Sequence, residues 1–144
     1  RLQGLPAAPS LFAEDGRDLI EQAAMRAVME NEYIQGYQPK DVSASRLGWD
    51  IESRIPHTGK LRFIEVKGRL SGAETITVTK NEILAGLNKP EDFILAIVEV
   101  EIRDGQPHAR RIHYLRRPFQ NEPDFAATSV NFEIRKLLKR ADVY

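Results

Sequence analysis

Residues 61–69 have the sequence Leu-Arg-Phe-Ile-Glu-Val-Lys-Gly-Arg. Apolar and charged side chains alternate at the start of this run, which predicts a β-strand. Because every second side chain of a strand points to the same face, Glu65 and Lys67 are expected to share a face. A second strand is predicted over Gly48 to Ser53, and turn residues separate the two. If these strands are neighbours in a sheet, Asp50 lies close to the Glu65 and Lys67 pair.

The rest of the chain predicts helices and further strands. Thr79 and Glu82 have the spacing of a capping box at the start of a helix. The run Phe93 to Val100 is short, apolar and β-branched, so we expect a central strand buried on both faces. The expected helices cover 14–33, 79–88 and 130–140, and the expected strands cover 42–46, 48–53, 61–67, 93–100 and 110–116, with a short extra one at 74–78. This order predicts an α/β fold with a central mixed sheet of about five strands flanked by helices.

The composition is that of one domain with its own core. The chain has 144 residues, of which 42% are hydrophobic and 29% charged, which argues against disorder. It has no cysteine, which excludes disulfides and thiolate chemistry and favours a reducing compartment. With no signal peptide or membrane span in the sequence, a cytoplasmic location is expected. We expect a tail or linker over 1–12 and a single domain over 13–144, as part of a larger protein because the chain begins with Arg1 rather than Met.

The charges balance, with 21 basic and 21 acidic side chains. This balance argues against a generally basic nucleic-acid binder, although local basic patches can bind phosphate at zero net charge. Basic residues gather near 60–69, 110–117 and 135–140. Each cluster is alternatively an ordinary solvated surface.

The predicted cluster of Asp50, Glu65 and Lys67 suggests metal-dependent chemistry on a phosphate. Carboxylate oxygens that converge suit Mg²⁺, and a nearby lysine can orient an attacking water and stabilise charge on a phosphate. The alternative is a structural ion pair between Asp50 and Lys67 with no metal. The sequence has no Walker-type loop, GxGxxG, HExxH or GxSxG motif, so the chemistries of those motifs find no support.

Asp50 followed by Glu65-Val66-Lys67 resembles the signature of the PD-(D/E)XK nuclease superfamily, whose core is restriction-endonuclease-like. More narrowly, the run from Glu21 through these residues to Thr79 and Glu82 is similar to a Mrr-like domain. That domain is related to the C-terminal region of the plant NO VEIN protein and is often found at the C-terminal end of Swi/Snf-type and other helicases. The resemblance covers about residues 17–118. The superfamily's usual proline before the aspartate is Trp49 here.

The resemblance implies a role for each matching residue. Asp50 and Glu65 would bind Mg²⁺ or Mn²⁺ through their carboxylates, with the backbone carbonyl of Val66 as a further ligand. Lys67 would position the attacking water. The family often places a glutamate of the first helix near the metal, and Glu21 is the best match by position, with Glu30 and Glu32 as alternatives.

The sequence and the resemblance therefore suggest two alternative functions. The first is a Mg²⁺-dependent nuclease that hydrolyses phosphodiester bonds of DNA, as the C-terminal domain of a helicase-like protein, with a homodimer also considered. The second is a non-catalytic nucleic-acid-binding or protein-interaction module on the same fold. Arg62, Arg69 and Lys80 are the expected nucleic-acid contacts, and no membrane partner is expected. Cleavage that depends on a metal separates the two functions.

Overall fold

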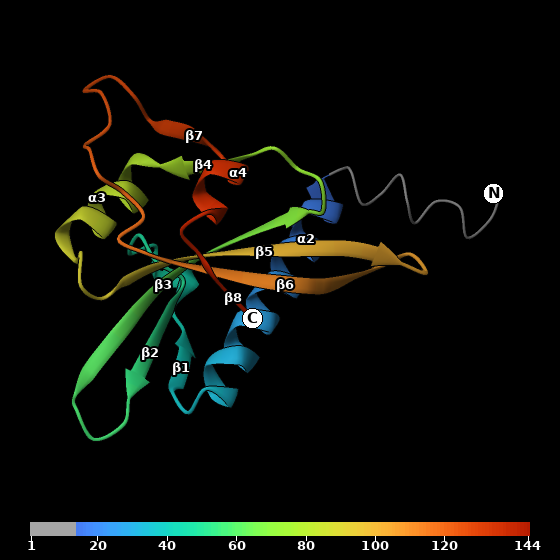
Figure 1. Cartoon of the computed structure of the whole chain (residues 1–144), viewed down its shortest axis with the longest axis horizontal. Helices are drawn as coiled ribbons and strands as arrows, with labels where there is room; N and C mark the ends of the chain where they lie inside the picture. Colours follow the sequence, from blue (N-terminus) through green and yellow to red (C-terminus); the bar gives the residue numbers. More distant parts are fainter. Residues whose placement is uncertain (1–13) are drawn as a thin grey trace.

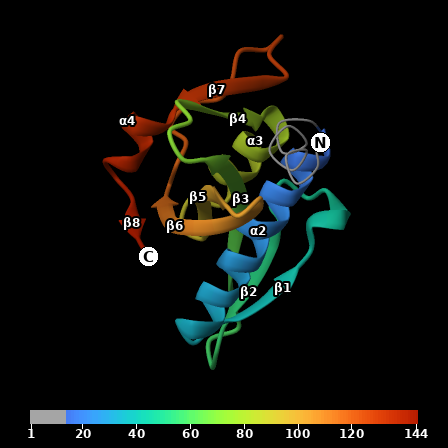
Figure 2. The same ribbon diagram turned by 90° about the vertical axis from the view of Figure 1, so that its right-hand side faces the viewer.

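The computed structural model describes residues 14–144, and the expected tail over 1–12 lies outside that range. Helix α2 lies along one face of a central sheet, and α3, α4 and a small second sheet cover the other face (Figures 1 and 2). None of the helices in this range is long and apolar enough to cross a membrane. The elements are α2 (Glu14–Ile34), β1 (Gln38–Asp41), a 3₁₀ turn η1 (Ser43–Ser45), β2 (Ile51–Ile55), β3 (Lys60–Leu70), β4 (Thr75–Thr79), α3 (Lys80–Asn88), β5 (Phe93–Arg103), β6 (Gln106–Arg116), β7 (Ser129–Glu133), α4 (Ile134–Leu138) and β8 (Asp142–Val143).

The central sheet is mixed and has six strands in the order β1-β2-β3-β5-β6-β8. Strands β3 and β5 pair in parallel, and the connection between them carries β4 and α3. The other neighbours pair antiparallel. Strands β4 and β7 form the small second sheet. The predicted α/β fold with a mixed sheet flanked by helices is confirmed, with six strands in place of about five.

The first half of strand β5, Phe93 to Val98, is buried on both faces, as its sequence predicts. Ile94, Ala96 and Val98 pack in the core cluster under α2. Phe93, Leu95 and Ile97 alternate with them and belong to the second cluster, beneath α3, β4 and α4. A strand with helices on both faces has no solvent side, so its sequence is continuously apolar.

Gly68 brings α2 close to β3. A Cβ atom built on Gly68 would lie 2.7 Å from the Ala24 Cβ and 3.1 Å from the Ile20 carbonyl oxygen. Real side chains are not found that close to their neighbours, so only glycine allows the helix to approach here. The part of α2 around Ile20 and Ala24 is thereby held against β3, close to Glu65 and Lys67.

Replacing Gly68 with alanine is expected to destabilise the protein by about 1–3 kcal/mol, since the added methyl group must displace the helix. Urea unfolding of parent and variant checks this. Ser71→Ala is the control, because Ser71 is exposed just beyond the same strand and its loss should cost under about 0.5 kcal/mol. Equal unfolding midpoints for Gly68→Ala and the parent would show that the contact is not needed.

The strand predicted over 42–46 is wrong. The strand before β2 is β1, Gln38–Asp41, and Ser43–Ser45 forms a 3₁₀ turn. The Asp41 carboxylate accepts hydrogen bonds from the backbone N–H and the hydroxyl of Ser43, at 2.9 and 2.7 Å. Such local bonds favour a turn over an extended strand.

The helix predicted over 130–140 is wrong in its first half. Ser129–Glu133 is strand β7, paired with β4, and the helix is confined to Ile134–Leu138. Val130 and Phe132 are half-buried, whereas their neighbours in the strand are exposed. This period of two is that of a strand with one buried face.

Candidate functional site

A cleft of about 730 Å³ opens between the start of α2 and the middle of β3. The predicted site residues Asp50, Glu65 and Lys67 all line it, together with Val66. Thr77 and Glu82, from the β4 and α3 region, close its other side. The structure therefore brings together the catalytic and metal-binding set that the sequence predicts.

Asp50 is held against β3 by its backbone and its side chain. Its N–H donates to the Ile64 carbonyl at 2.8 Å, and its carboxylate accepts the Val66 N–H at 2.9 Å. Gly48 makes this entry to β2 possible, because its φ is +99° and a Cβ there would lie 2.8 Å from the Ala85 Cβ. The Asp50 carboxylate is thus fixed at the point where β2 meets β3.

The Glu65 carboxyl is almost fully buried, with 4% of the residue exposed. Burial, and next the charge of Asp50, raise the pKa of Glu65 to about 10, although Lys67 opposes this. Burial also raises the pKa of Asp50, against the hydrogen bond from Val66. Two acidic groups that disfavour each other's charge in a cleft are an arrangement that a bound cation would relieve.

Lys67 contacts two carboxylates. Its Nζ lies 3.3 Å from Glu65 Oε2 and donates a hydrogen bond of 2.8 Å to Glu82 Oε1. Burial alone would lower the pKa of Lys67, but the carboxyl groups of Glu65 and Glu82 raise it above its ordinary value. The ammonium is therefore kept charged at the floor of the cleft.

Glu82 is a site residue that sequence reasoning missed. The predicted capping box is confirmed: the Thr79 hydroxyl accepts the Glu82 N–H at 3.2 Å, and Glu82 Oε1 accepts the Thr79 N–H at 2.9 Å. The same oxygen also binds Lys67. The capping motif accounts for a glutamate at this position, so the sequence carries no separate signal that it also reaches the site.

The structure distinguishes the three glutamates considered on the first helix. Glu21 is exposed and lines the cleft. Glu30 lines a separate hollow beside Arg110. Glu32 is fully buried and binds Arg62. Glu21 is therefore the one of these three that lines the same cleft as Asp50 and Glu65.

The three expected nucleic-acid contacts lie in three different places. Arg69 is exposed and lines the cleft. The Lys80 ammonium lies outside the cleft lining and donates to the Phe125 carbonyl at 3.2 Å. Arg62 is only 6% exposed, and its guanidinium donates to both Glu32 oxygens, at 2.8 and 3.1 Å. Arg62 thus forms a core ion pair in place of the expected contact with nucleic acid.

The Glu65 carboxyl makes stability depend on pH when no metal is added. Its pKa is about 10 in the folded protein and near 4.5 ordinarily, so unfolding releases a proton between these values. The contribution of Glu65 to the free energy of unfolding therefore falls as pH rises through that range, by at most about 1.4 kcal/mol per pH unit. Glu65→Gln should flatten this part of the profile, measured by urea unfolding at several pH values in EDTA. Parallel profiles for parent and variant would contradict the raised pKa.

Comparison with known families adds one finding. Residues 20–114, well over half of the chain, match the family described as Protein NO VEIN, C-terminal. No curated protein matches the chain. The matched range begins in α2 and ends in β6, so it contains every residue placed in the cleft above. The chain belongs to the NO VEIN C-terminal family.

Proposed function

We propose that this NO VEIN C-terminal domain is a nuclease of the PD-(D/E)XK type, which hydrolyses phosphodiester bonds of DNA with Mg²⁺ or Mn²⁺. The observation that carries the proposal is the buried Glu65 carboxyl beside Asp50 in a cleft that Lys67 also lines. A buried acidic pair is costly unless a cation compensates it. The proposal includes a place at the C-terminal end of a helicase-like protein, as the resemblance implies.

The donor atoms in the cleft suit Mg²⁺ better than an ion that needs a full set of protein ligands. Within residues 14–144, no group of three or more His, Cys, Asp or Glu side chains gathers to hold a metal. Mg²⁺ is commonly held by one or two carboxylates and completes its shell with waters and substrate phosphates. Asp50 and Glu65 would supply those carboxylates, and the carbonyl of Val66 follows Glu65 directly in the chain. Glu21 lines the same cleft and would act through a bound water.

Each residue of the cleft would have its own role in the proposed reaction. When bound, the metal would supply Lewis-acid activation of the phosphate and of the attacking water. Lys67 places a positive charge beside the carboxyl pair, where it can orient the water and stabilise the negative charge that develops on the phosphate. Glu82 fixes the Lys67 ammonium from the opposite side. The Val66 N–H holds Asp50 in the orientation that faces the cleft.

A specific contact favours a second candidate. Lys67 is already paired with both Glu65 and Glu82, as it would be in a site that keeps its charges for stability alone. The second candidate is therefore a module that binds nucleic acid or a protein partner without cutting. Such a module would bind in a salt-sensitive way and leave the substrate intact in Mg²⁺ and Mn²⁺.

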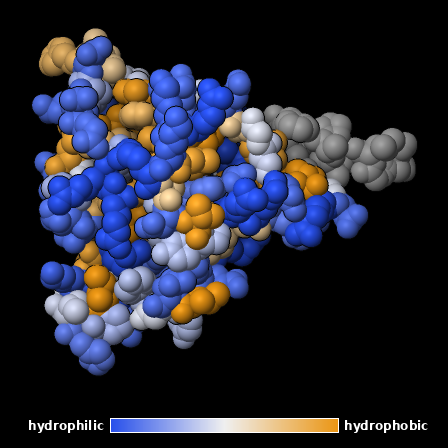
Figure 3. Space-filling model, viewed as in Figure 1, coloured by the Kyte–Doolittle hydropathy of each residue, from blue (hydrophilic) through white to orange (hydrophobic). Residues whose placement is uncertain are grey.

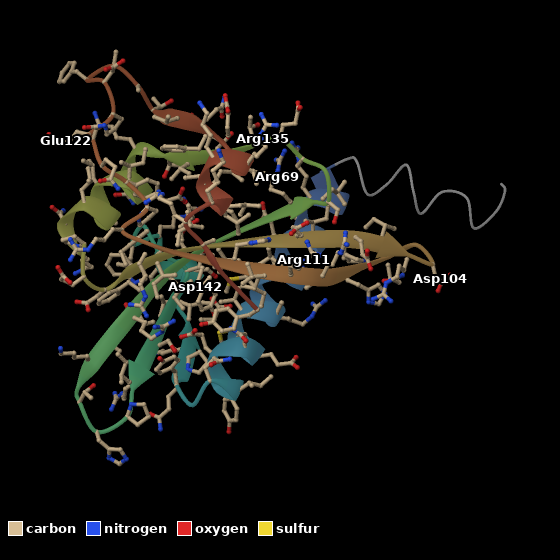
Figure 4. All side chains as sticks on the ribbon, viewed as in Figure 1. Arg69, Asp104, Arg111, Glu122, Arg135 and Asp142 are labelled. Carbon is tan, nitrogen blue, oxygen red and sulfur yellow. The ribbon has the colours of Figure 1, made fainter. Side chains whose placement is uncertain are left out.

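Plasmid nicking in Mg²⁺, Mn²⁺ or EDTA separates the two candidates. The nuclease proposal predicts metal-dependent nicking by the parent and none by Asp50→Asn. Asp104→Asn is the matched control, because Asp104 lies in the β5–β6 turn far from the cleft (Figure 4), where asparagine tolerates its positive φ. Intact plasmid under all conditions, or equal nicking by Asp50→Asn, would rule the proposal out.

A further inference from the structure

A second cleft adjoins the first near the C-terminal end of β3. It encloses about 620 Å³ between the end of β3, the middle of β5 and the β7–α4 segment. Arg69 lines both clefts, and Arg135 of α4 lines the second one with it. Figure 4 shows Arg69 and Arg135 on the β7 and α4 side of the central sheet, away from the β5–β6 turn. Arg69 therefore joins the proposed reaction centre to a neighbouring binding surface.

The strand geometry sets the spacing along this path. Lys67 and Arg69 lie on the same face of β3, two residues and about 7 Å apart. That spacing is comparable to the distance between neighbouring phosphates of an extended nucleic-acid strand. In register with Arg69, β5 carries Glu99 and β6 carries Arg111, so a row of charged residues crosses the sheet at this level.

The charges in the second cleft leave its arginines available. No ion pair engages Arg69 or Arg135 within residues 14–144, and both are exposed. Glu99 instead pairs with the buried His113 at 2.6 Å, and Glu133 with Lys136 at 3.5 Å. Glu99 and Glu133 thus have partners other than these arginines, and Glu74 also lines the cleft. The two guanidinium groups have hydrogen-bond donors to offer.

The rest of the lining suits the less polar parts of a nucleotide. Leu70, Ile134 and Leu138 contribute apolar surface between the two arginines. Hydrophilic side chains cover most of the face seen in Figure 3, with apolar ones scattered between them. A phosphodiester chain, with charged phosphates and apolar faces of sugar and base, matches such a mixed lining.

We propose that the second cleft binds the phosphodiester backbone of a nucleic acid on one side of the scissile bond, with Arg69 and Arg135 as its phosphate contacts. The inference rests on the proposed function for the identity of its ligand and for the position of the scissile bond. It adds Arg135, from the C-terminal segment beyond the family match, to the nucleic-acid-binding residues. It also gives the bound strand a path, from Glu65 and Lys67 in the middle of β3 toward α4.

The test measures binding in EDTA, so that it does not depend on cleavage. The probes are fluorescein-labelled 20-nucleotide DNA, single-stranded or annealed to its complement, followed by anisotropy over a series of salt concentrations. Removal of one phosphate contact should reduce the slope of log affinity against log salt by about 0.7 for single strands or 0.9 for duplex. Arg69→Ala and Arg135→Ala should each show this reduction and weaker binding. Arg110→Ala, which removes an exposed arginine at a different hollow, should leave both unchanged.

Each outcome bears on a different part of the account. Reduced slopes for Arg69→Ala and Arg135→Ala, with no change for Arg110→Ala, support nucleic-acid binding in the second cleft even if the parent cuts no plasmid. The probe that binds more tightly shows whether the ligand is single-stranded or duplex. A parent that nicks plasmid while Arg135→Ala keeps the full slope overturns this inference and leaves the nuclease standing. No binding of either probe, or equal losses in Arg110→Ala, also overturns it.

Discussion

Replacing Lys67 with methionine is expected to lower the rate of Mg²⁺-dependent DNA cleavage about 100- to 1,000-fold. Methionine keeps much of the length of the side chain but removes the ammonium beside Glu65 and Glu82. The charge that develops on the phosphate then loses its nearest protein cation, and the attacking water loses a hydrogen-bond donor. Single-turnover cleavage of a labelled duplex measures the loss.

Two controls separate a catalytic loss from unfolding. Lys60→Met removes an exposed lysine at the far end of the same strand and should cut at the parental rate. Urea unfolding of Lys67→Met should show a cooperative transition, since a folded variant is needed to interpret its rate. A folded Lys67→Met protein that cuts as fast as the parent would remove Lys67 from the mechanism.

The second large effect concerns stability. Glu32→Ala should destabilise the protein by about 3–5 kcal/mol, because Arg62 would keep a buried charge with no partner. Glu32 is fully buried, accepts two bonds from the Arg62 guanidinium and accepts a third, of 2.8 Å, from the Tyr114 hydroxyl. A domain is typically stable by about 5–15 kcal/mol in total, so this one substitution removes a large share.

Urea unfolding of parent, Glu32→Ala and Glu30→Ala checks this expectation. Glu30 is exposed on the same helix, and its replacement should change stability by less than about 0.5 kcal/mol. The double variant Glu32→Leu with Arg62→Met should recover much of the loss, because neither charge is then buried. A loss below about 1 kcal/mol for Glu32→Ala would mean that water reaches the Arg62 guanidinium.

The same ion pair helps to place the candidate site. Glu32 near the C-terminal end of α2 is tied to Arg62 near the start of β3. At the middle of the helix, Ala24 packs on Gly68. Two fixed points on one helix and one strand determine how the helix crosses the sheet, and Glu21 comes to line the cleft as a result.

The parts of the fold that the sequence predicts well are those with a local cause. The Glu65-Val66-Lys67 strand and the continuously apolar β5 follow from side-chain periodicity. The start of α3 follows from the capping box of Thr79 and Glu82. The meeting of Asp50 with Glu65 and Lys67 follows from antiparallel pairing of β2 with β3. Their causes lie within a few residues or in one strand pair.

The parts that the sequence does not predict depend on distant partners. Arg62 belongs to a basic cluster in the sequence, and nothing nearby shows that Glu32, thirty residues earlier, will neutralise it. The alternation of Val130 and Phe132 is too short to separate 129–133 from the helix that follows it, and the segment forms a strand by pairing with β4. The second cleft likewise depends on α4 reaching Arg69 from far along the chain.

The most direct test of the account is calorimetric titration of Mn²⁺ and Mg²⁺ into the parent and into Asp50→Asn. The account predicts one divalent-cation site in the parent, with loss of that binding in the variant. It also predicts release of protons on binding, since burial and Asp50 raise the pKa of Glu65 to about 10 and the bound cation requires the carboxylate. No binding to the parent, or equal binding to Asp50→Asn, would contradict the claim that Asp50 and Glu65 form a metal centre.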